Sequence, residues 1–148
     1  MFSSWFFLTL MHLIGLSLGV GAATVKLMLL LKANSDPGFV ATYLKVNRPI
    51  TRIIIIGLIL LTLSGIVWIF QGVSFTTVFI IKLVLVLAMW VMGPIIDNVI
   101  EPKYKKFAPV AGNQVSPEFN RIQRKLLIIE TIATLDFYVI MVLGVLLL

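Results

Sequence analysis

The sequence predicts an all-α integral membrane protein, an up-and-down four-helix bundle that forms a single transmembrane domain over residues 1–148. Hydrophobic residues make up 60% of the chain, a share typical of membrane proteins and not of water-soluble domains. Four apolar runs are each long enough to cross a hydrocarbon core of about 30 Å, which takes about 20 helical residues. Short connections between the runs favour antiparallel neighbours.

The four expected helices are separated by polar or turn-forming segments. The first ends before the sequence NSDPG, and the short uncharged sequence QGVSF separates the second from the third. Gly93 and Pro94 are expected to kink the last turns of the third helix. The expected helices cover residues about 3–31, 50–70, 75–99 and 124–148.

The positive charges predict the orientation. Ten of the twelve Lys and Arg residues lie in segments 32–52 and 103–125, which flank apolar runs. By the positive-inside rule, loops 32–49 and 100–123 are cytoplasmic and both termini lie on the outer side. The same distribution argues against nucleic acid as a partner, because no basic groove is formed. We expect a multi-pass protein of the cell's inner (cytoplasmic) membrane.

The rare polar residue types limit the possible chemistry. The chain has no cysteine, which excludes disulfides, thiolate metal sites and C-x-x-C-H haem attachment. It has one histidine, so neither a multi-histidine metal site nor a bis-histidine haem site forms within one chain.

Polar side chains inside the apolar runs converge on one layer. At about 1.5 Å per residue, His12 and Lys82 both lie about 12–13 Å below the outer surface. Ser64 falls near that depth, and Asp136 lies somewhat deeper. Charged groups at such depth are costly and are functional candidates by default. The alternative is a buried packing network in which Asp136 neutralises Lys82.

Small residues follow His12 along one stripe of the first helix. Gly15 and Gly19 have the spacing that lets membrane helices approach closely. This stripe therefore packs into the bundle or makes room for a flat ligand. It ends at Lys26, near the cytoplasmic boundary, where snorkelling to the headgroups explains the lysine. Glu130 lies in the same inner layer and Asp97 lies nearer the cytoplasmic end of the third helix. Both are either interface residues or candidate partners of Lys26.

Haem b fits the outer layer. A lone neutral histidine in a dry four-helix interior is a natural axial ligand for haem iron, and His12 is that candidate, as metal ligand or as proton acceptor. Lys82 is a second ligand if deprotonated, or a propionate partner or base. Asp136 balances charge or relays protons. A porphyrin substrate suits the same apolar site.

The sequence also resembles a known family. MHLIGLSLGVGAAT in the first helix and FIIKLVLVLAMW in the third are similar to the HemJ-type protoporphyrinogen oxidases and the wider CopD-like membrane superfamily. The matching positions are His12 with Gly15 and Lys82 with Leu83. The resemblance implies that His12 and Lys82 act in haem binding and in oxidising a porphyrinogen, which would make the chain a membrane oxidoreductase.

Two other functions remain open at this point. One is a non-enzymatic accessory or structural membrane subunit. The other is copper transport of the CopD type, with a soft copper(I) site from Met11, Met89 and Met141. Gly15 and Gly19 also permit a homo-oligomer or a partner membrane subunit, and a dimer would supply two histidines to one haem.

Overall fold

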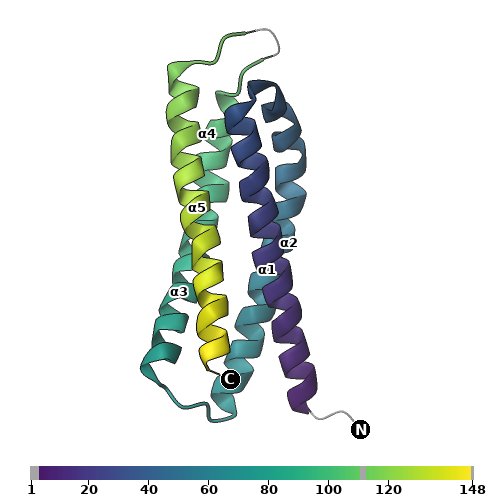
Figure 1. The fold of residues 1–148 in the computed structure, drawn as a ribbon, viewed down its shortest axis with the longest axis vertical. Coiled ribbons are helices and arrows are strands. Elements are labelled where there is room, and N and C mark those ends of the chain that lie inside the picture. Colours follow the sequence, from purple (N-terminus) through teal and green to yellow (C-terminus); the bar gives the residue numbers. More distant parts are fainter. Residues whose placement is uncertain (1–3, 111–112, 148) are drawn as a thin grey trace.

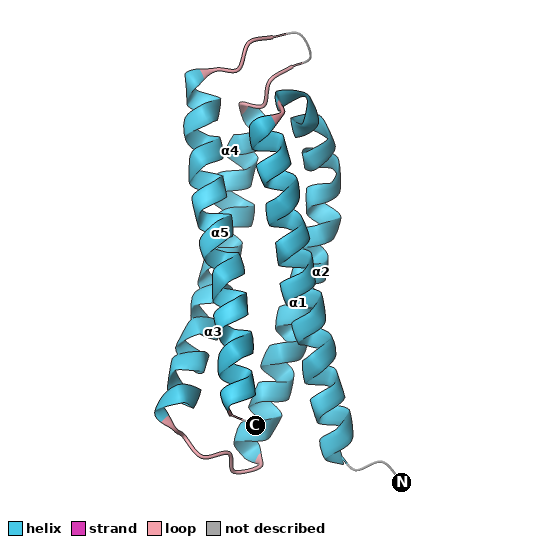
Figure 2. Cartoon of the chain, in the orientation of Figure 1, coloured by secondary structure: helices cyan, strands magenta, loops and turns pink. Residues whose placement is uncertain are grey.

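The computed structural model describes residues 4–110 and 113–147, and the secondary structure in these ranges is entirely helical (Figures 1 and 2). Four long helical spans pack as a bundle, which confirms the predicted fold class. The elements in chain order are α1 (Ser4–Ser35), the 3-10 helix η1 (Pro37–Phe39), α2 (Val40–Phe70), α3 (Thr77–Ile95), the π-helix η2 (Ile96–Ile100), α4 (Glu101–Lys106) and α5 (Pro117–Leu146).

The spans are long and apolar enough to cross a membrane, so the chain is a multi-pass membrane protein. They run up and down, with α3, η2 and α4 forming one continuous span. Figure 1 shows the start of α1 and the end of α5 at the same end of the bundle, together with the turn 71–76. We call this the terminal end, and we call the other, which holds η1 and residues 107–110 and 113–116, the loop end.

The helices extend beyond the apolar runs that predicted them. α1 continues to Ser35, and α2 starts at Val40, so most of the expected loop 32–49 is helical. The third span reaches Lys106 and α5 begins at Pro117. Spans of about 30 residues are about 45 Å long, which exceeds the hydrocarbon core. Their charged ends therefore reach the headgroup region while the main-chain helix continues.

Local capping explains where the helices stop and start. Asp36 Oδ1 accepts a hydrogen bond from Gly38 N at 3.0 Å, which closes the turn between α1 and α2. Gly72 has a φ of +87° just after α2, a left-handed conformation that favours glycine. The side chains of Thr76 and Ser116 accept hydrogen bonds from main-chain N–H groups in the first turns of α3 and α5.

Pro94 changes the third span without ending it. Proline lacks the N–H that the preceding turn of an α-helix would use, and the α-helix gives way to the π-helix η2 just after it. The side chain of Asn98 donates a hydrogen bond to Pro94 O at 3.0 Å. The expected perturbation at Gly93-Pro94 is thus a π-helical segment, of the kind often found at functional positions.

The bundle core has two different packing regions. At the loop end, Tyr43, Tyr104 and Phe119 are buried, with ring centroids 5.7 Å apart for Tyr43–Tyr104 and 4.9 Å for Tyr104–Phe119. Towards the terminal end, glycines bring α1 and α2 together. On α1, Leu10 and Ile14 are exposed on the outside of the bundle, where lipid would cover them.

Candidate functional site

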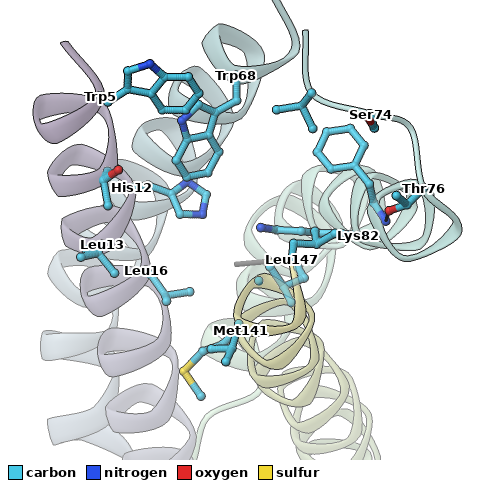
Figure 3. A pocket seen from close by; sticks show the side chains of 16 residues that line it. Trp5, His12, Leu13, Leu16, Trp68, Ser74, Thr76, Lys82, Met141 and Leu147 are labelled. Carbon is cyan, nitrogen blue, oxygen red and sulfur yellow. Dashed lines mark hydrogen bonds between the residues drawn. The ribbon is translucent and has the colours of Figure 1, made fainter. Parts of the chain in front are cut away.

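A cavity of about 560 Å³ opens at the terminal end between the α1–α2 pair and the α3–α5 pair. Its volume lies within the about 300–1,000 Å³ that ligand sites have. The walls are mainly apolar and include Leu16, Trp68 and Phe79, while His12 and Lys82 supply nitrogen atoms. Figure 3 shows the His12 ring and the Lys82 amine projecting from opposite walls towards each other. The two leading candidates from the sequence therefore share one cavity.

The neighbours of His12 define which ring nitrogen is free. Nδ1 lies 2.7 Å from Ser64 Oγ. The Ser64 hydroxyl also lies within hydrogen-bond distance of the carbonyls of Leu60 and Leu61, at 2.8 and 3.0 Å. Carbonyls only accept, so this arrangement favours a hydroxyl proton directed at them and a Ser64 Oγ that accepts the proton on Nδ1. It therefore favours the Nδ1–H tautomer of His12, which leaves a lone pair on Nε2.

Packing fixes the orientation of the His12 ring as well. The indole of Trp68 lies against it, with ring centroids 4.6 Å apart and planes tilted by 44°. A histidine that binds a metal usually donates its other N–H to an acceptor, which sets both tautomer and ring direction. In this site, Ser64 Oγ lies where that acceptor is expected, beside His12 Nδ1. The depth argument that put Ser64 level with His12 is confirmed.

Lys82 is half-buried in the cavity wall. Within the described ranges its ammonium has no ion-pair partner and no hydrogen-bond acceptor. It lies against the end of α5, where a Cβ added to Gly144 would come within 3.3 Å of Nζ. An unpaired cation in an apolar cavity is costly, so this position favours a ligand with an anionic group.

Gly15 and Gly19 do not line the cavity. A Cβ on Gly15 would lie 2.9 Å from Gly57 O, and one on Gly19 would lie 2.7 Å from Phe137 Cε1. Both glycines therefore allow α1 to approach α2 and α5 closely. This agrees with the expectation that their side of α1 packs into the bundle. The expectation that they make room for a flat ligand stays a prediction.

Asp136 lies deeper than the cavity. It precedes Gly144 by two helical turns, so it is about 12 Å along α5 from the level of Lys82. It is 8% exposed, and its Oδ2 has no hydrogen-bond partner among the described residues. Direct neutralisation of Lys82 by Asp136 is therefore not present. A proton-relay role for Asp136 stays a prediction.

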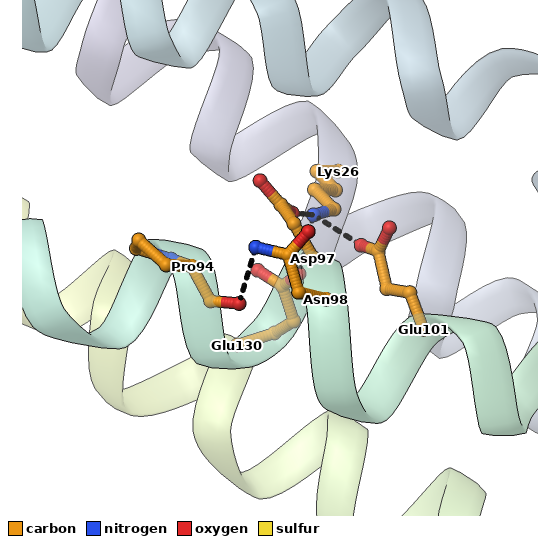
Figure 4. A network of polar contacts seen from close by, with 6 residues as sticks. All are labelled: Lys26, Pro94, Asp97, Asn98, Glu101 and Glu130. Atoms are coloured by element: carbon orange, nitrogen blue, oxygen red, sulfur yellow. Dashed lines mark hydrogen bonds and ion pairs between the residues drawn. The ribbon is translucent and has the colours of Figure 1, made fainter.

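Lys26 does not extend to the membrane surface. It is 2% exposed, and its Nζ lies 2.6 Å from Glu130 Oε1 and 2.7 Å from Glu101 Oε1, with Asp97 Oδ1 at 4.0 Å (Figure 4). The snorkelling interpretation is wrong, and the alternative of acidic partners is confirmed. The two close Oε1 atoms accept no well-aligned hydrogen bond, so these contacts are ion pairs. We call these four residues the Lys26 cluster.

Electrostatics make the Lys26 cluster unusual. Glu101 Oε1 and Glu130 Oε1 approach the same ammonium, so they are at most about 5 Å apart, and two charges at that separation repel by about 3 kcal/mol at an effective dielectric of 20. Sequence reasoning missed Glu101 because it was assigned to a loop. Its spacing of four residues from Asp97 was the available signal, since such pairs share a helix face.

The methionines proposed for copper lie apart. Met141 lines the terminal-end cavity, whereas Met89 lines a much smaller cavity beside Lys26. Among the residues that the structure describes, no group of three or more His, Cys, Asp or Glu side chains is arranged to hold a metal ion. The arrangement gives no support to a copper(I) site built from Met11, Met89 and Met141.

Comparison with known proteins leaves the family open. No protein-family model, no curated protein and no solved structure matches this chain. The architecture is therefore that of a four-helix membrane bundle, and its function is argued from the cavity itself.

Proposed function

We propose that this protein binds haem b or a porphyrin in the terminal-end cavity and takes part in redox chemistry within the membrane. The observation that carries the proposal is the His12 imidazole. Its Nδ1 is held by Ser64 and its Nε2 lone pair is free on the side of a large apolar cavity. This is the state in which histidine binds haem iron.

The residues of the cavity fit such a group in size and chemistry. Leu16, Trp68 and Phe79 offer apolar and aromatic surface to a flat ring system. Lys82 offers a positive charge, which pairs with a propionate carboxylate. The cavity opens near one end of the bundle, and the charged edge of the ligand would lie beside Lys82 while its ring lies against the apolar walls.

The roles of the chain's own residues follow from this placement. His12 Nε2 would hold the iron, or accept a proton from a metal-free porphyrinogen. Ser64 keeps that nitrogen unprotonated and correctly oriented. Lys82 would hold the anionic edge or, when deprotonated, act as a second ligand. Bound haem would supply one-electron redox chemistry. The resemblance to the HemJ-type family favours oxidation of a porphyrinogen as the reaction.

The first test is haem binding by His12. We would record visible absorption spectra of the detergent-purified protein with haem supplied, oxidised and reduced, beside His12→Ala. Thr9→Ala is the matched control, because Thr9 lines the same cavity one turn away on α1. We expect a Soret band that His12→Ala abolishes or shifts and that Thr9→Ala leaves unchanged. Absence of a band in the wild type, or an identical band in folded His12→Ala, would refute the proposal.

Lys82 variants separate its two possible roles. Lys82→Met removes both a ligand and a charge, whereas Lys82→Arg keeps the charge and does not ligate iron. If Lys82 pairs with a propionate, Lys82→Arg retains haem affinity and the wild-type spectrum. If Lys82 is the second ligand, both variants change the spectrum from six-coordinate to five-coordinate iron. Haem binding that neither variant alters in affinity or spectrum would exclude both roles.

Enzymatic activity needs its own assay. Expression of the protein in cells that lack their protoporphyrinogen oxidase should restore growth, and His12→Ala should not. Failure of the well-expressed wild type to restore growth, together with normal haem binding, would remove porphyrinogen oxidation and leave membrane electron transfer as the function.

A further inference from the structure

The Lys26 cluster lies in the half of the bundle towards the loop end, away from the terminal-end cavity. Its members come from four elements: Lys26 from α1, Asp97 from η2, Glu101 from α4 and Glu130 from α5. Figure 4 shows the three carboxylates around the single ammonium. Nothing in the proposed haem chemistry uses these residues.

The charges of the Lys26 cluster do not balance. Three carboxylates face one ammonium, so complete ionisation would leave two uncompensated negative charges inside a membrane bundle. Lys26 and Glu130 are almost completely buried, at 2% and 3% exposure. Buried charges need a partner, and without one they are neutralised. The described residues around these carboxylates provide no second cation within ion-pair distance, so protonation of a carboxylate would lower the excess negative charge.

Buried polar groups without a hydrogen-bond partner also lie beside the Lys26 cluster. Tyr43 on α2 is 0% exposed, its hydroxyl has no hydrogen-bond partner among the described residues, and it lies within electrostatic range of Glu130 and Glu101. A small cavity of about 60 Å³ lies against Lys26 and Glu130, and Thr51, whose hydroxyl is also buried without a partner, lines it. This is enough room for water. Water and protons would satisfy these groups.

The three acidic side chains of the Lys26 cluster differ in how far they are exposed. The side chain of Glu130 is 4% exposed, that of Glu101 is 16% and that of Asp97 is 27%. Asp97 lies in the π-helix η2, and Glu101 follows one turn later, so both face Lys26 from the same span. A proton can therefore enter at Asp97 and reach Glu130 through groups that are close to the same ammonium.

We propose that the Lys26 cluster is a proton-binding site that exchanges with the loop-end side of the membrane. A proton from water at that side adds to a carboxylate and gives a neutral carboxylic acid, which leaves Lys26 to pair with the remaining carboxylates. Glu101 and Glu130 hold this proton between them, Asp97 passes it from the surface, and Tyr43 and Thr51 complete the hydrogen bonds. The site holds at least one proton at neutral pH.

Infrared spectroscopy tests this directly, because the chain has only six acidic residues. We would use the full chain in lipid and follow the carbonyl band of protonated carboxylic acids between pH about 5 and about 9. Asp136→Asn serves as the background, so that its buried carboxyl does not contribute. Glu130→Gln and Glu101→Gln are the test variants. Glu118→Gln, at the exposed start of α5, is the control.

The expected result is a protonated-carboxyl band at neutral pH, corresponding to about one proton per chain, that shifts in deuterated water. Glu130→Gln and Glu101→Gln should each remove or shift it, and Glu118→Gln should leave it unchanged. Absence of the band at neutral pH, or a band that survives both substitutions, would overturn the proposal. If Glu130→Gln does not fold, Glu101→Gln decides, because Glu101 lies nearer the surface.

Discussion

Replacing Gly57 by alanine should open the tightest helix crossing in the bundle. A Cβ at position 57 would lie 2.6 Å from Gly19 N, 2.7 Å from Gly15 O and 2.9 Å from Gly19 Cα. Carbon atoms do not approach so closely, and all three neighbours are main-chain atoms that cannot rotate away. α1 and α2 must therefore separate along a crossing on which the positions of His12 and Ser64 depend.

The size of the effect follows from two opposing contributions. Overpacking of a well-packed core costs about 1–3 kcal/mol, whereas glycine to alanine within a helix gains up to about 1 kcal/mol. The expected net loss for Gly57→Ala is about 1–2 kcal/mol, which lowers the Tm by about 2–8 °C for a chain of this size. Thermal unfolding of the purified protein in one detergent, followed by circular dichroism, measures it.

Gly65 provides the matched control on the same helix. An added Cβ there would have no atom within 4 Å, so Gly65→Ala should keep the wild-type Tm or raise it slightly. The two variants make the same chemical change and differ only in what surrounds the new methyl group. Equal melting temperatures for Gly57→Ala and Gly65→Ala would refute the close α1–α2 crossing, and with it the geometry of the His12 site.

Three further predictions follow from single contacts. Ser64→Ala should weaken haem binding about 10–100-fold, because it removes the acceptor that orients His12; a haem titration with unchanged affinity would contradict this. Lys26→Met should destabilise the protein by about 3–5 kcal/mol while Lys32→Met, at a side chain that is 58% exposed, should have little effect on the Tm. Trp90→Phe should cost about 0.6 kcal/mol through the lost hydrogen bond from Nε1 to Thr62 Oγ1, 3.0 Å long; Thr62→Val should add no further loss if that bond is the cause.

The sequence was sufficient for the architecture and for the depth of the main polar groups. Apolar runs predict which segments cross the membrane. Because a helix rises by a fixed distance per residue, the position of a residue along its helix predicts its depth in the membrane. That is why Ser64 could be placed level with His12, and why both His12 and Lys82 were expected in one layer. Their shared cavity needed the structure, because its walls include the turn 71–76 and the end of α5.

The face that each helix presents was harder to predict. Spacing shows which residues share a face, but the rotation of each helix depends on contacts with its neighbours. Gly15 and Gly19 share the stripe of His12, yet they contact α2 and α5 while His12 reaches the cavity. Asp136 was expected somewhat deeper than Lys82, with pairing to Lys82 as an alternative, and it lies about two turns deeper without pairing to it.

Helix ends were also misjudged from hydropathy. The third span was expected to stop at residue 99, where charged residues begin, but its main chain continues to Lys106 through a π-helix. Main-chain hydrogen bonds do not depend on side-chain hydropathy, and charged side chains are stable at the headgroup level. This single error concealed Glu101 and changed the interpretation of Lys26 from a snorkelling residue to the centre of a buried ion-pair cluster.

The most direct test of the central claim is nuclear magnetic resonance of nitrogen-15-labelled histidine. His12 is the only histidine in the sequence, so a protein purified without a histidine tag gives signals from one imidazole. We expect a neutral ring at pH about 7, protonated on Nδ1, with an unprotonated Nε2 signal that haem shifts or broadens beyond detection. A proton on Nε2, a charged imidazolium, or an Nε2 signal that does not change when haem is added would contradict the proposed binding of haem by His12.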